Sequence, residues 1–337
     1  MSGWGYLRGR RLWRRRGWGG VAAMAAVCTL AIGGTLTPLG DRGPISRGAA
    51  TPLTTARYAS APQQAHDNCD ASLDPSTGPT DGPAVERIRQ RGRLKVGVDQ
   101  NSYLWGFRDP ATGQLAGFDI DLVHALARSI LGDPDAVQFL TVPTSQRIPL
   151  IKNGTVDMVV RTMTINCQRV DDPKNPVAFS TPYFEAGQQI LAPEGSSVTG
   201  FDDSLQGKTV CTARGSTGEQ TLEGNRHGAS ILLVDNQLDC LVRLQLGLAD
   251  AVFTDNALAA GQAAQDPSVH LVGHPVTDEP YGVAMNTGEP DLVRKVNAVL
   301  AAYRSGGADS EWMTSYRRWL AQDLPGLTGP PAPKYRQ

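Results

Sequence analysis

The sequence predicts an α/β protein made of two lobes, on the basis of three observations. From residue 84 onward, short apolar runs alternate with segments of helical periodicity, which is typical of a parallel sheet covered by helices. The same alternation begins again after Tyr183. A chain of 337 residues is also long enough for about two domains of ordinary size.

The first lobe is expected to start with a short helix, followed by a strand that ends in a carboxylate. A helix, a strand, a second helix and another strand come next, so that the strands can lie parallel. The expected segments are the helix 84–91, the strand 93–99, the helix 119–131, the strand 137–142, the helix 146–153 and the strand 156–160.

The second lobe repeats this pattern, and the C-terminal part of the chain then returns to the first. Lobe 1 is therefore expected to comprise residues 84–180 and 275–337, and lobe 2 residues 181–274. Trp312 and Trp319 are expected to contact the core. The expected segments are strands at 188–191, 208–212, 231–234, 250–253 and 280–285, and helices from Ser216 onward, at 240–246, at 292–303 and at 311–320.

The N-terminus has the pattern of an export signal. Residues 1–20 contain six Arg and no acid, and residues 17–39 run without a charge. This pattern is typical of a signal peptide, and the apolar run is also long enough to serve as a membrane anchor. We expect residues 1–40 to act as one or the other, with Cys28 as an alternative lipidation point. Residues 41–83 are rich in Pro, Gly, Ser, Thr and Ala, which predicts a flexible linker.

The charge distribution argues against nucleic-acid binding. Removing the six N-terminal positive charges from the overall net charge of −1 leaves −7 for the remainder. An acidic body has no general attraction to phosphate backbones, so nucleic acid is excluded as a partner.

Four cysteines lie in the part of the chain that is expected to be exported. An even number in an oxidising compartment predicts two disulfides. Three pairings are possible, of which we favour Cys211 with Cys240 and Cys69 with Cys167. The His and Cys residues are too scattered for a zinc site, and no metal or other cofactor is expected.

Motifs of common enzyme classes are missing from the sequence. It contains no GxGxxG, GxxxxGK[ST], GxSxG or HExxH pattern, so no catalytic residue is predicted. Polar residues instead follow several predicted strands, namely Asp99, Arg169 and Asp255. Ligands of open α/β sheets bind at the carboxyl ends of the strands.

These residue types suit a zwitterion. Arg can hold a carboxylate and Asp an ammonium group, while the segment Arg214–Gly218 lies between a strand and a helix whose N–H groups can bind a carboxylate. The alternative for Ser216 and Thr217 is a purely structural role as the cap of that helix.

Several sequence blocks in a fixed order resemble one family. They are Arg93–Asp99, Gly117–Asp121, Arg147–Leu150, Asn153–Asp157, Thr162–Ile165, Arg169, Phe179–Phe184, Gly207–Val210, Gly215–Thr217 and Ala249–Asp255. With these blocks, residues 90–320 resemble the polar-amino-acid-binding family of bacterial extracellular solute-binding proteins, and are most similar to the glutamate/glutamine-binding branch of actinobacteria. The resemblance implies a two-lobe periplasmic-binding-protein-like fold of type II. Two crossover segments, near 179–183 and 274–281, are then expected to join the lobes.

The resemblance also implies roles by position. Arg169 and Thr164 match the residues that hold the α-carboxylate of the ligand, and Asp255 matches the acid that receives the α-ammonium group. Asp99 falls at a position that contacts the ligand. The turn formed by Gly215, Ser216 and Thr217 matches one that contacts carboxylates through backbone N–H groups.

Two departures from the family pattern concern the ligand's surroundings. Aromatic rings are common in the family where Ser102 and Thr144 stand, so Tyr103 and Trp105 are the expected substitutes, with Tyr183 as a third. Arg161 stands where a small residue is usual. It is expected either to meet an acidic side chain of the ligand or to be a charge on the lobe surface.

The implied function is extracytoplasmic binding of an acidic amino acid or its amide, by closure of the two lobes, for delivery to an ABC importer. The partners are then the amino acid and an integral membrane permease, and the protein is either attached to the cell membrane or secreted. One alternative is a sensor that reports amino-acid levels to a membrane receptor. Another is a dehydratase-like enzyme on the same fold.

Overall fold

The computed structural model describes residues 69–336, which belong to one compact unit of the chain. The predicted signal or anchor at 1–40, Cys28 and residues 41–68 of the predicted linker lie outside the described residues. Within 69–336, every helix is too short or too polar to span a bilayer.

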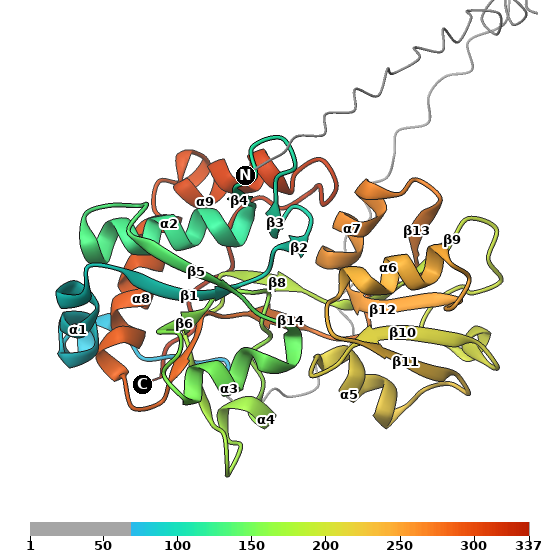
Figure 1. Cartoon of the computed structure of the whole chain (residues 1–337), viewed down its shortest axis with the longest axis horizontal. Coiled ribbons are helices and arrows are strands. Elements are labelled where there is room, and N and C mark those ends of the chain that lie inside the picture. Colours follow the sequence, from blue (N-terminus) through green and yellow to red (C-terminus); the bar gives the residue numbers. More distant parts are fainter. Residues whose placement is uncertain (1–68, 337) are drawn as a thin grey trace, which may run out of the picture. The chain divides into compact units, whose positions relative to one another are not determined.

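Lobe 1 is built on a five-stranded mixed sheet with the order β5-β1-β6-β15-β7 (Figure 1). The central strand β1 (Leu94–Val98) pairs in parallel with β5 (Val137–Thr141) and with β6 (Met158–Val159). The returning strand β15 (Ala284–Asn286) is antiparallel to β6 and to β7 (Val177–Phe179). This order places the carboxyl ends of β1 and β6 next to each other, so the residues that follow them lie at one edge of the sheet.

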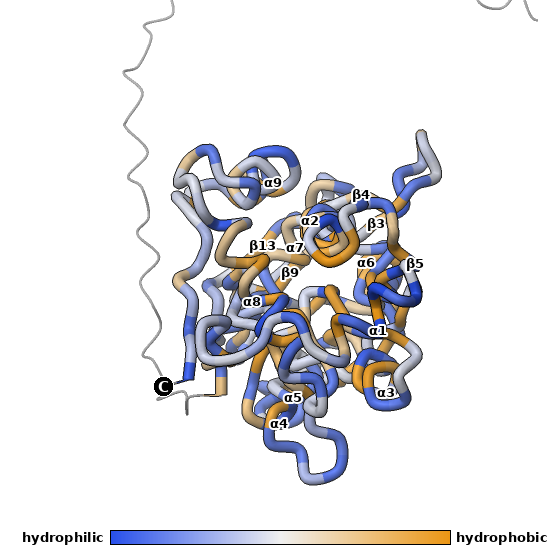
Figure 2. Tube along the Cα trace, turned by 90° about the vertical axis from the view of Figure 1, so that its left-hand side faces the viewer, coloured by the Kyte–Doolittle hydropathy of each residue, from blue (hydrophilic) through white to orange (hydrophobic). Residues whose placement is uncertain are grey.

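Helices cover both faces of this sheet. One face carries the larger core, in which Trp105, Phe118, Phe184 and Trp312 pack edge to face or stacked. Figure 2 shows the apolar side of α2 turned toward this interior. The helices on this face are α1 (Pro83–Arg91), α2 (Phe118–Leu131), α8 (Pro290–Arg304) and α9 (Glu311–Trp319), and those packed with the smaller core are α3 (Arg147–Lys152) and α4 (Cys167–Val170).

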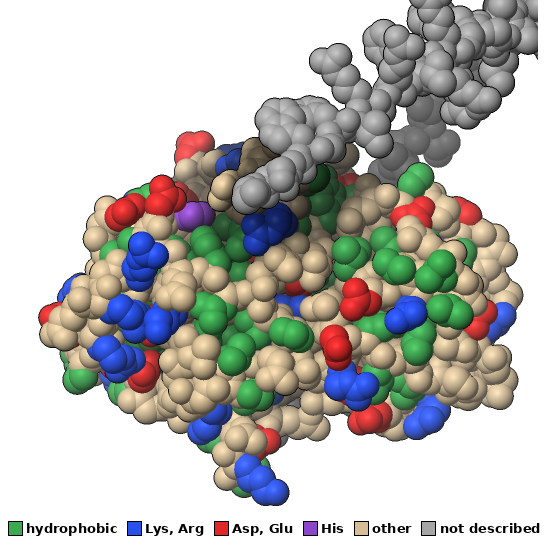
Figure 3. Space-filling view, in the orientation of Figure 1, with side chains coloured by type: hydrophobic (Ala, Val, Ile, Leu, Met, Phe, Trp, Pro, Cys, Tyr) green, Lys and Arg blue, Asp and Glu red, His purple; other side chains and the backbone are tan. Residues whose placement is uncertain are grey.

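Lobe 2 has a five-stranded sheet of the same type, with the order β11-β10-β12-β9-β13. Helix α5 (Thr217–Gly224) contributes to one core, and α6 (Leu238–Gln245) and α7 (Asn256–Gln265) contribute to the other. Figure 3 shows hydrophobic side chains over the face that carries α6 and α7. The strands are β9 (Gln188–Pro193), β10 (Thr209–Ala213), β11 (Ser230–Val234), β12 (Ala251–Asp255) and β13 (Val269–Val272).

Two antiparallel strands, β8 (Phe184–Ala186) and β14 (Glu279–Tyr281), join the lobes. Tyr183, Phe184 and Tyr281 pack in the large core of lobe 1. The predicted boundary at residue 181 is therefore corrected, because the chain leaves lobe 1 only after β8. A small sheet of β2 (Asn101–Ser102), β3 (Gly106–Arg108) and β4 (Leu115–Ala116) follows β1.

The linker predicted over 41–83 extends too far into the folded part. Cys69 forms a disulfide with Cys167 on α4, and Ser72 pairs with Tyr335 near the C-terminus. Asn297 Nδ2 donates to Ser72 Oγ at 2.8 Å. Low hydrophobicity suggested a linker, but a disulfide and hydrogen bonds to the C-terminal segment hold residues 69–83 to lobe 1.

Both favoured disulfide pairings are confirmed, with Cα atoms 5.3 Å apart in Cys69–Cys167 and 5.5 Å apart in Cys211–Cys240. Each predicted segment has a counterpart in the structure, but residues 280–285 are divided differently, and several observed elements were not predicted. The elements without a prediction are the strands β2, β3, β4, β7, β8 and β13 and the helices α4 and α7. Residues 280–285 form parts of two strands, β14 and β15, separated at Gly282 and Val283. Helix α7 was not predicted, since its Ala-rich sequence has little contrast between its two sides.

Candidate functional site

A cavity lies between the lobes, where the carboxyl ends of several strands meet. Asp99 directly follows β1, Arg161 follows β6, and Asp255 is the last residue of β12. Loops after neighbouring parallel strands converge at such an edge, which is where ligands of open α/β sheets bind. The lining residues are Asp99, Ser102, Thr144, Arg147, Arg161, Thr162, Thr164, Arg169, Ser216, Thr217, Gly218, Gln237, Thr254, Asp255 and Leu258.

Most of the ligand-binding residues predicted from the sequence come together in this cavity. They are Asp99, Arg161, Thr164 and Arg169 from lobe 1 and Ser216, Thr217 and Asp255 from lobe 2.

The predicted aromatic substitutes lie elsewhere. Trp105 is fully buried, and its Nε1 donates to the carbonyl of Ala257 at 2.9 Å. Tyr103 packs edge-on against Phe107, with ring centroids 4.9 Å apart. Tyr183 is fully buried, and its hydroxyl donates to Asp119 Oδ1 at 2.8 Å. The prediction that these rings surround the ligand is corrected, because core packing and hydrogen bonds already hold them.

Arg169 projects from α4 at the interface between the lobes. Its Nη1 donates to the carbonyl of Thr164 at 2.6 Å, and its Nη2 reaches the carbonyl of Gly215 on lobe 2 at 3.4 Å. Burial lowers the pKa of Arg169, although the guanidinium group remains protonated in proteins. A buried cation bonded to neutral carbonyls lacks full charge compensation, which favours an anionic partner.

A second buried guanidinium, which the sequence did not reveal as a site residue, lies beside the first. Arg147 on α3 donates from Nε to Thr144 O at 2.9 Å and from Nη2 to Gly215 O at 3.2 Å. Burial lowers its pKa well below the usual value, and the neighbouring positive charge of Arg169 lowers it further. Arg147 therefore adds positive charge to the cavity and helps to hold the lobes together.

Gly215 joins the lobes and does not line the cavity. Its φ is 76°, and a Cβ at this position would lie 2.9 Å from Cα of Ser145 on lobe 1. Only glycine fits such a close approach with a left-handed backbone. The N–H of Gly215 donates to Glu219 Oε2 at 2.6 Å. The prediction that this N–H contacts a ligand carboxylate is therefore corrected.

Arg161 is paired within the cavity. Its Nη2 lies 2.9 Å from Asp99 Oδ2, and its Nη1 donates to Thr144 Oγ1 at 2.9 Å. The side chain is only 3% exposed, so the surface alternative is excluded. Asp99 also accepts from Ser102 Oγ at 2.7 Å. The Arg161 guanidinium group in the cavity is therefore balanced in charge by the neighbouring Asp99 carboxylate.

Asp255 faces the cavity from lobe 2. Its Oδ2 accepts from the hydroxyl of Tyr281 at 2.6 Å. Burial raises the pKa of Asp255 to about 7, and the nearby carboxylate of Glu279 contributes to the increase. A ligand cation at this position would compensate the negative charge and favour the ionised form.

Glu279, on the crossing strand β14, was also not predicted as part of the site. Its Oε2 accepts from Thr164 Oγ1 of lobe 1 at 2.5 Å and from Thr217 Oγ1 of lobe 2 at 2.8 Å. Its Oε1 accepts from Thr277 Oγ1 at 2.8 Å. One buried carboxylate therefore links hydroxyl groups from both lobes.

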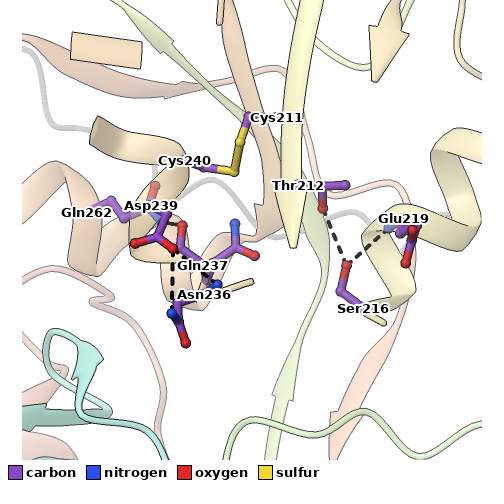
Figure 4. Close-up of a disulfide and its surroundings, with 9 residues drawn as sticks. All are labelled: Cys211, Thr212, Ser216, Glu219, Asn236, Gln237, Asp239, Cys240 and Gln262. Atoms are coloured by element: carbon purple, nitrogen blue, oxygen red, sulfur yellow. Dashed lines mark hydrogen bonds between the residues drawn. A yellow bond between two sulfur atoms is a disulfide. The ribbon is translucent and has the colours of Figure 1, made fainter. Parts of the chain in front are cut away.

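Ser216 has the structural role that the sequence left open, and it also lines the cavity. Its Oγ accepts from Glu219 N at 3.1 Å and so caps α5. Figure 4 shows Ser216 and Thr212 close together, with hydroxyl oxygens 3.4 Å apart. Cys211, directly before Thr212, is linked by the disulfide to Cys240 on α6.

Three polar residues of the site that were not predicted from the sequence are Gln237, Arg147 and Glu279, and only Gln237 has a sequence signal that the strand-end rule uses. Gln237 follows the predicted strand 231–234 and precedes a helix, so the strand-end rule that selected Asp99 and Asp255 would have selected it. Arg147 begins one of the blocks that resemble the family, but it lies within a predicted helix, and Glu279 lies within the predicted crossover 274–281. The strand-end rule selects neither of them.

Comparison with known sequences connects this geometry to a family. Residues 94–322 match the sequence model of the bacterial extracellular solute-binding proteins, family 3. The chain is 36% identical over 236 residues to the ABC transporter glutamine-binding protein GlnH of Bacillus subtilis, which covers 70% of this chain and 84% of that protein. It is 27% identical over 258 residues to the glutamate/aspartate import solute-binding protein of Salmonella typhimurium, with 73% and 82% covered.

Solved structures show the same likeness in three dimensions. An ancestral arginine-binding protein bound to glutamine is similar with a TM-score of 0.62 and 36% identity, covering 68% of this chain and 98% of that one. A mutant of ArgBP from T. maritima is similar with a TM-score of 0.65 and 29% identity, covering 71% of this chain and 100% of that one. These structures share the two-lobe fold of type II.

Proposed function

Because this chain belongs to the bacterial extracellular solute-binding proteins of family 3 and is a binding protein, not an enzyme, we propose that its ligand is an acidic amino acid or its amide. Glutamate, aspartate, glutamine and asparagine are the candidates. The observation that carries this proposal is that Arg169 of lobe 1 and Asp255 of lobe 2 line the same cavity.

The two ends of a free amino acid match these two residues. Arg169 receives the α-carboxylate, and Asp255 receives the α-ammonium group. The Thr164 hydroxyl donates its one proton to Glu279, so it assists the carboxylate only if that bond is exchanged on ligand binding. Thr217, at the start of α5, lines the same cavity and also donates its hydroxyl proton to Glu279. Glu279 lies close enough to Asp255 to raise its pKa, so it strengthens the negative potential around the ammonium group.

The part of the cavity lined by Arg161 and Asp99 suits a ligand whose side chain ends in a carboxylate or a carboxamide. Arg161 offers guanidinium donors there, while Asp99 balances its charge. A fully unbalanced Arg would favour a carboxylate strongly over a carboxamide. The paired Arg161 supports binding of both, in agreement with relatives named as glutamine-binding and as glutamate/aspartate import proteins.

Ligand binding and lobe closure are coupled in this proposal, because neither lobe alone satisfies both ends of the ligand. Charge-assisted hydrogen bonds contribute about 1.5 to 3 kcal/mol each. Four or five such bonds outweigh the free-energy cost of ordering the ligand and closing the lobes. The difference is roughly 8 kcal/mol, which corresponds to a micromolar Kd. The crossing strands β8 and β14 are the segments about which the lobes would move.

The family acts outside the cytoplasm, and the proposed partner is the permease of an ABC importer. The protein is attached to the cell membrane or secreted, according to whether the segment 1–40 is kept. The closed form is the one that the permease recognises, since closure is what reports that the ligand is bound.

Isothermal titration calorimetry tests the ligand class. The purified protein is unfolded to remove bound solute, refolded with its disulfides intact, and titrated with glutamate, aspartate, glutamine and asparagine. We expect heat of binding with micromolar affinity for at least one of them, and none with a simple dicarboxylate such as succinate, which lacks the ammonium group. Absence of heat with all four amino acids contradicts the proposal.

A further inference from the structure

Two buried polar groups in the cavity have hydrogen-bonding capacity that the described protein groups do not use. Gln237 is 5% exposed, and its Nε2 has no hydrogen-bond partner among residues 69–336. Arg161 Nε is likewise without an acceptor there, and Arg161 Nη2 approaches Asp99 without hydrogen-bond geometry. Leaving such groups unsatisfied costs free energy, so they indicate where a ligand's polar atoms belong.

The two groups line the same cavity, although they come from different lobes. Arg161 Nη1 donates to the hydroxyl of Thr144. The backbone N–H of Thr144 donates across the cleft to Asp235 O at 3.2 Å, and Asp235 lies two residues before Gln237. Thr144 therefore connects the Arg161 guanidinium to the loop that carries Gln237.

From these contacts we infer that Arg161 and Gln237 form the subsite for the ligand's side chain, and that Gln237 lets this subsite accept both a carboxylate and a carboxamide. This inference rests on the function proposed above and adds to it the specificity-determining residue. Arg161 can only donate, so it requires an oxygen acceptor, which glutamate and glutamine both carry.

The amide of Gln237 can serve either ligand, since it carries a donor on one side and an acceptor on the other. It donates from Nε2 to the second oxygen of a carboxylate. After rotation about its last side-chain bond, it accepts with Oε1 from the NH2 of a carboxamide. Basic side chains such as that of arginine offer Arg161 no acceptor and add a positive charge beside it, so this subsite excludes them.

The backbone of Gln237 is fixed independently of its side chain. Gln262 Nε2 donates to the carbonyl of Gln237 at 3.1 Å, and the disulfide Cys211–Cys240 ties the first turns of α6 to β10 (Figure 4). Neither contact involves the Gln237 amide. Substitution of this side chain should therefore leave the fold of lobe 2 intact.

Calorimetry on three variants of the full chain tests the inference. For Gln237→Leu, which removes both hydrogen-bonding functions, we expect the Kd of glutamine and of glutamate to rise about tenfold, as for one lost hydrogen bond. For Gln237→Glu, which only accepts and carries a negative charge, we expect the ratio of the glutamate Kd to the glutamine Kd to rise by about tenfold or more. The matched control Gln220→Leu, on the exposed side of α5, should change neither value.

The outcomes separate this inference from the proposed function. If the wild-type protein binds none of the four amino acids, both fail. If the wild type binds them and Gln237→Leu and Gln237→Glu leave the two Kd values unchanged, the proposed function stands and the inference is overturned. Tight arginine binding by the wild type would also overturn it. Thermal melting identifies a misfolded variant, in which case Gln237→Asn replaces it, and a tenfold weakening by this shortened amide is the expected result.

Discussion

The two lobes have similar sheets but supply opposite halves of the site. Lobe 1 is assembled from separate parts of the chain around an aromatic core and brings three buried guanidinium groups to the cavity, those of Arg147, Arg161 and Arg169. Lobe 2 is one continuous segment with smaller cores, and it brings the carboxylate of Asp255 and the hydroxyls at the start of α5.

Because the two lobes bring groups of opposite charge to the cavity, their similar sheets together form one site and not two separate sites. The strand ends of each lobe present polar groups, but a zwitterion needs positive and negative partners at a fixed separation. Lobe 1 pairs one of its cations internally, Arg161 with Asp99, whereas within residues 69–336 the Arg169 guanidinium donates to two backbone carbonyls. The acid that receives the ammonium group in the proposed function, Asp255, is on the other lobe, so that proposal makes recognition depend on closure.

The disulfides provide the largest contrast between the lobes. Cys69–Cys167 spans 98 residues and Cys211–Cys240 spans 29. On the chain-entropy model, removing them costs about 4.7 and about 3.6 kcal/mol of unfolding free energy. Urea denaturation of the Cys69→Ala/Cys167→Ala and Cys211→Ala/Cys240→Ala variants measures both losses. Equal losses, or a larger loss in lobe 2, would contradict an entropic origin.

Removing the Arg169 guanidinium group of lobe 1 should strongly weaken ligand binding. Arg169→Ala leaves the α-carboxylate without its partner, and truncating one member of a buried charge pair costs about 2 to 5 kcal/mol. We expect calorimetry to show affinity for every ligand reduced by a factor of about 30 or more. Arg243→Ala, at an exposed position on α6, is the control. Undiminished binding by Arg169→Ala would refute the assignment of the α-carboxylate to this residue.

Each lobe also has one buried acid whose pKa is raised to about 7, Asp119 in lobe 1 and Asp255 in lobe 2. Burial is the main cause in both. The folded protein binds more protons than the unfolded chain between about pH 4 and 7, so this stabilisation is present at low pH and is lost as pH rises through 7.

The ligand-free protein should therefore melt at a higher temperature at pH 5 than at pH 8. Asp119→Asn and Asp255→Asn should each flatten this dependence, and calorimetric melting across this range measures it. A slope that neither substitution changes would show that other groups cause it.

The hydroxyl groups that meet at Glu279 allow a smaller, symmetric test of closure. Thr164 donates from lobe 1 and Thr217 from lobe 2. Thr164→Val and Thr217→Val each remove a hydrogen bond to a carboxylate, so we expect a loss of about 1.5 to 3 kcal/mol, which weakens ligand binding by a factor of about 10 to 150. Calorimetry of the two variants gives the comparison. If only one of them weakens binding, Glu279 does not link the lobes as the contacts indicate.

The smallest effect is expected for Tyr103→Phe in lobe 1. Tyr103 packs against Phe107 outside the cavity lining, so removing its hydroxyl should leave the Kd of glutamate and glutamine unchanged. A tenfold weakening, measured by the same calorimetry, would restore the role that the sequence predicted for this ring.

The amino-acid sequence was enough to predict most of the strand and helix order and the polar residues at the strand ends. It left three disulfide pairings possible, and the structure confirms the favoured one. Apolar periodicity reports local burial, and the chain direction fixes which residues follow each strand. For this reason the positions of Asp99, Arg169 and Asp255 along the chain are enough to select them as site residues.

Which polar groups meet depends on how the chain folds in three dimensions. Trp105 was assigned to the ligand, but it packs against Phe184 of lobe 1, and its Nε1 donates to the carbonyl of Ala257 on α7 of lobe 2. Glu279 and Gln237 enter the site because the crossing strands and the contact at Gly215 bring the lobes together. Such convergence depends on distances between residues far apart in the chain, and local patterns of hydrophobicity do not encode those distances.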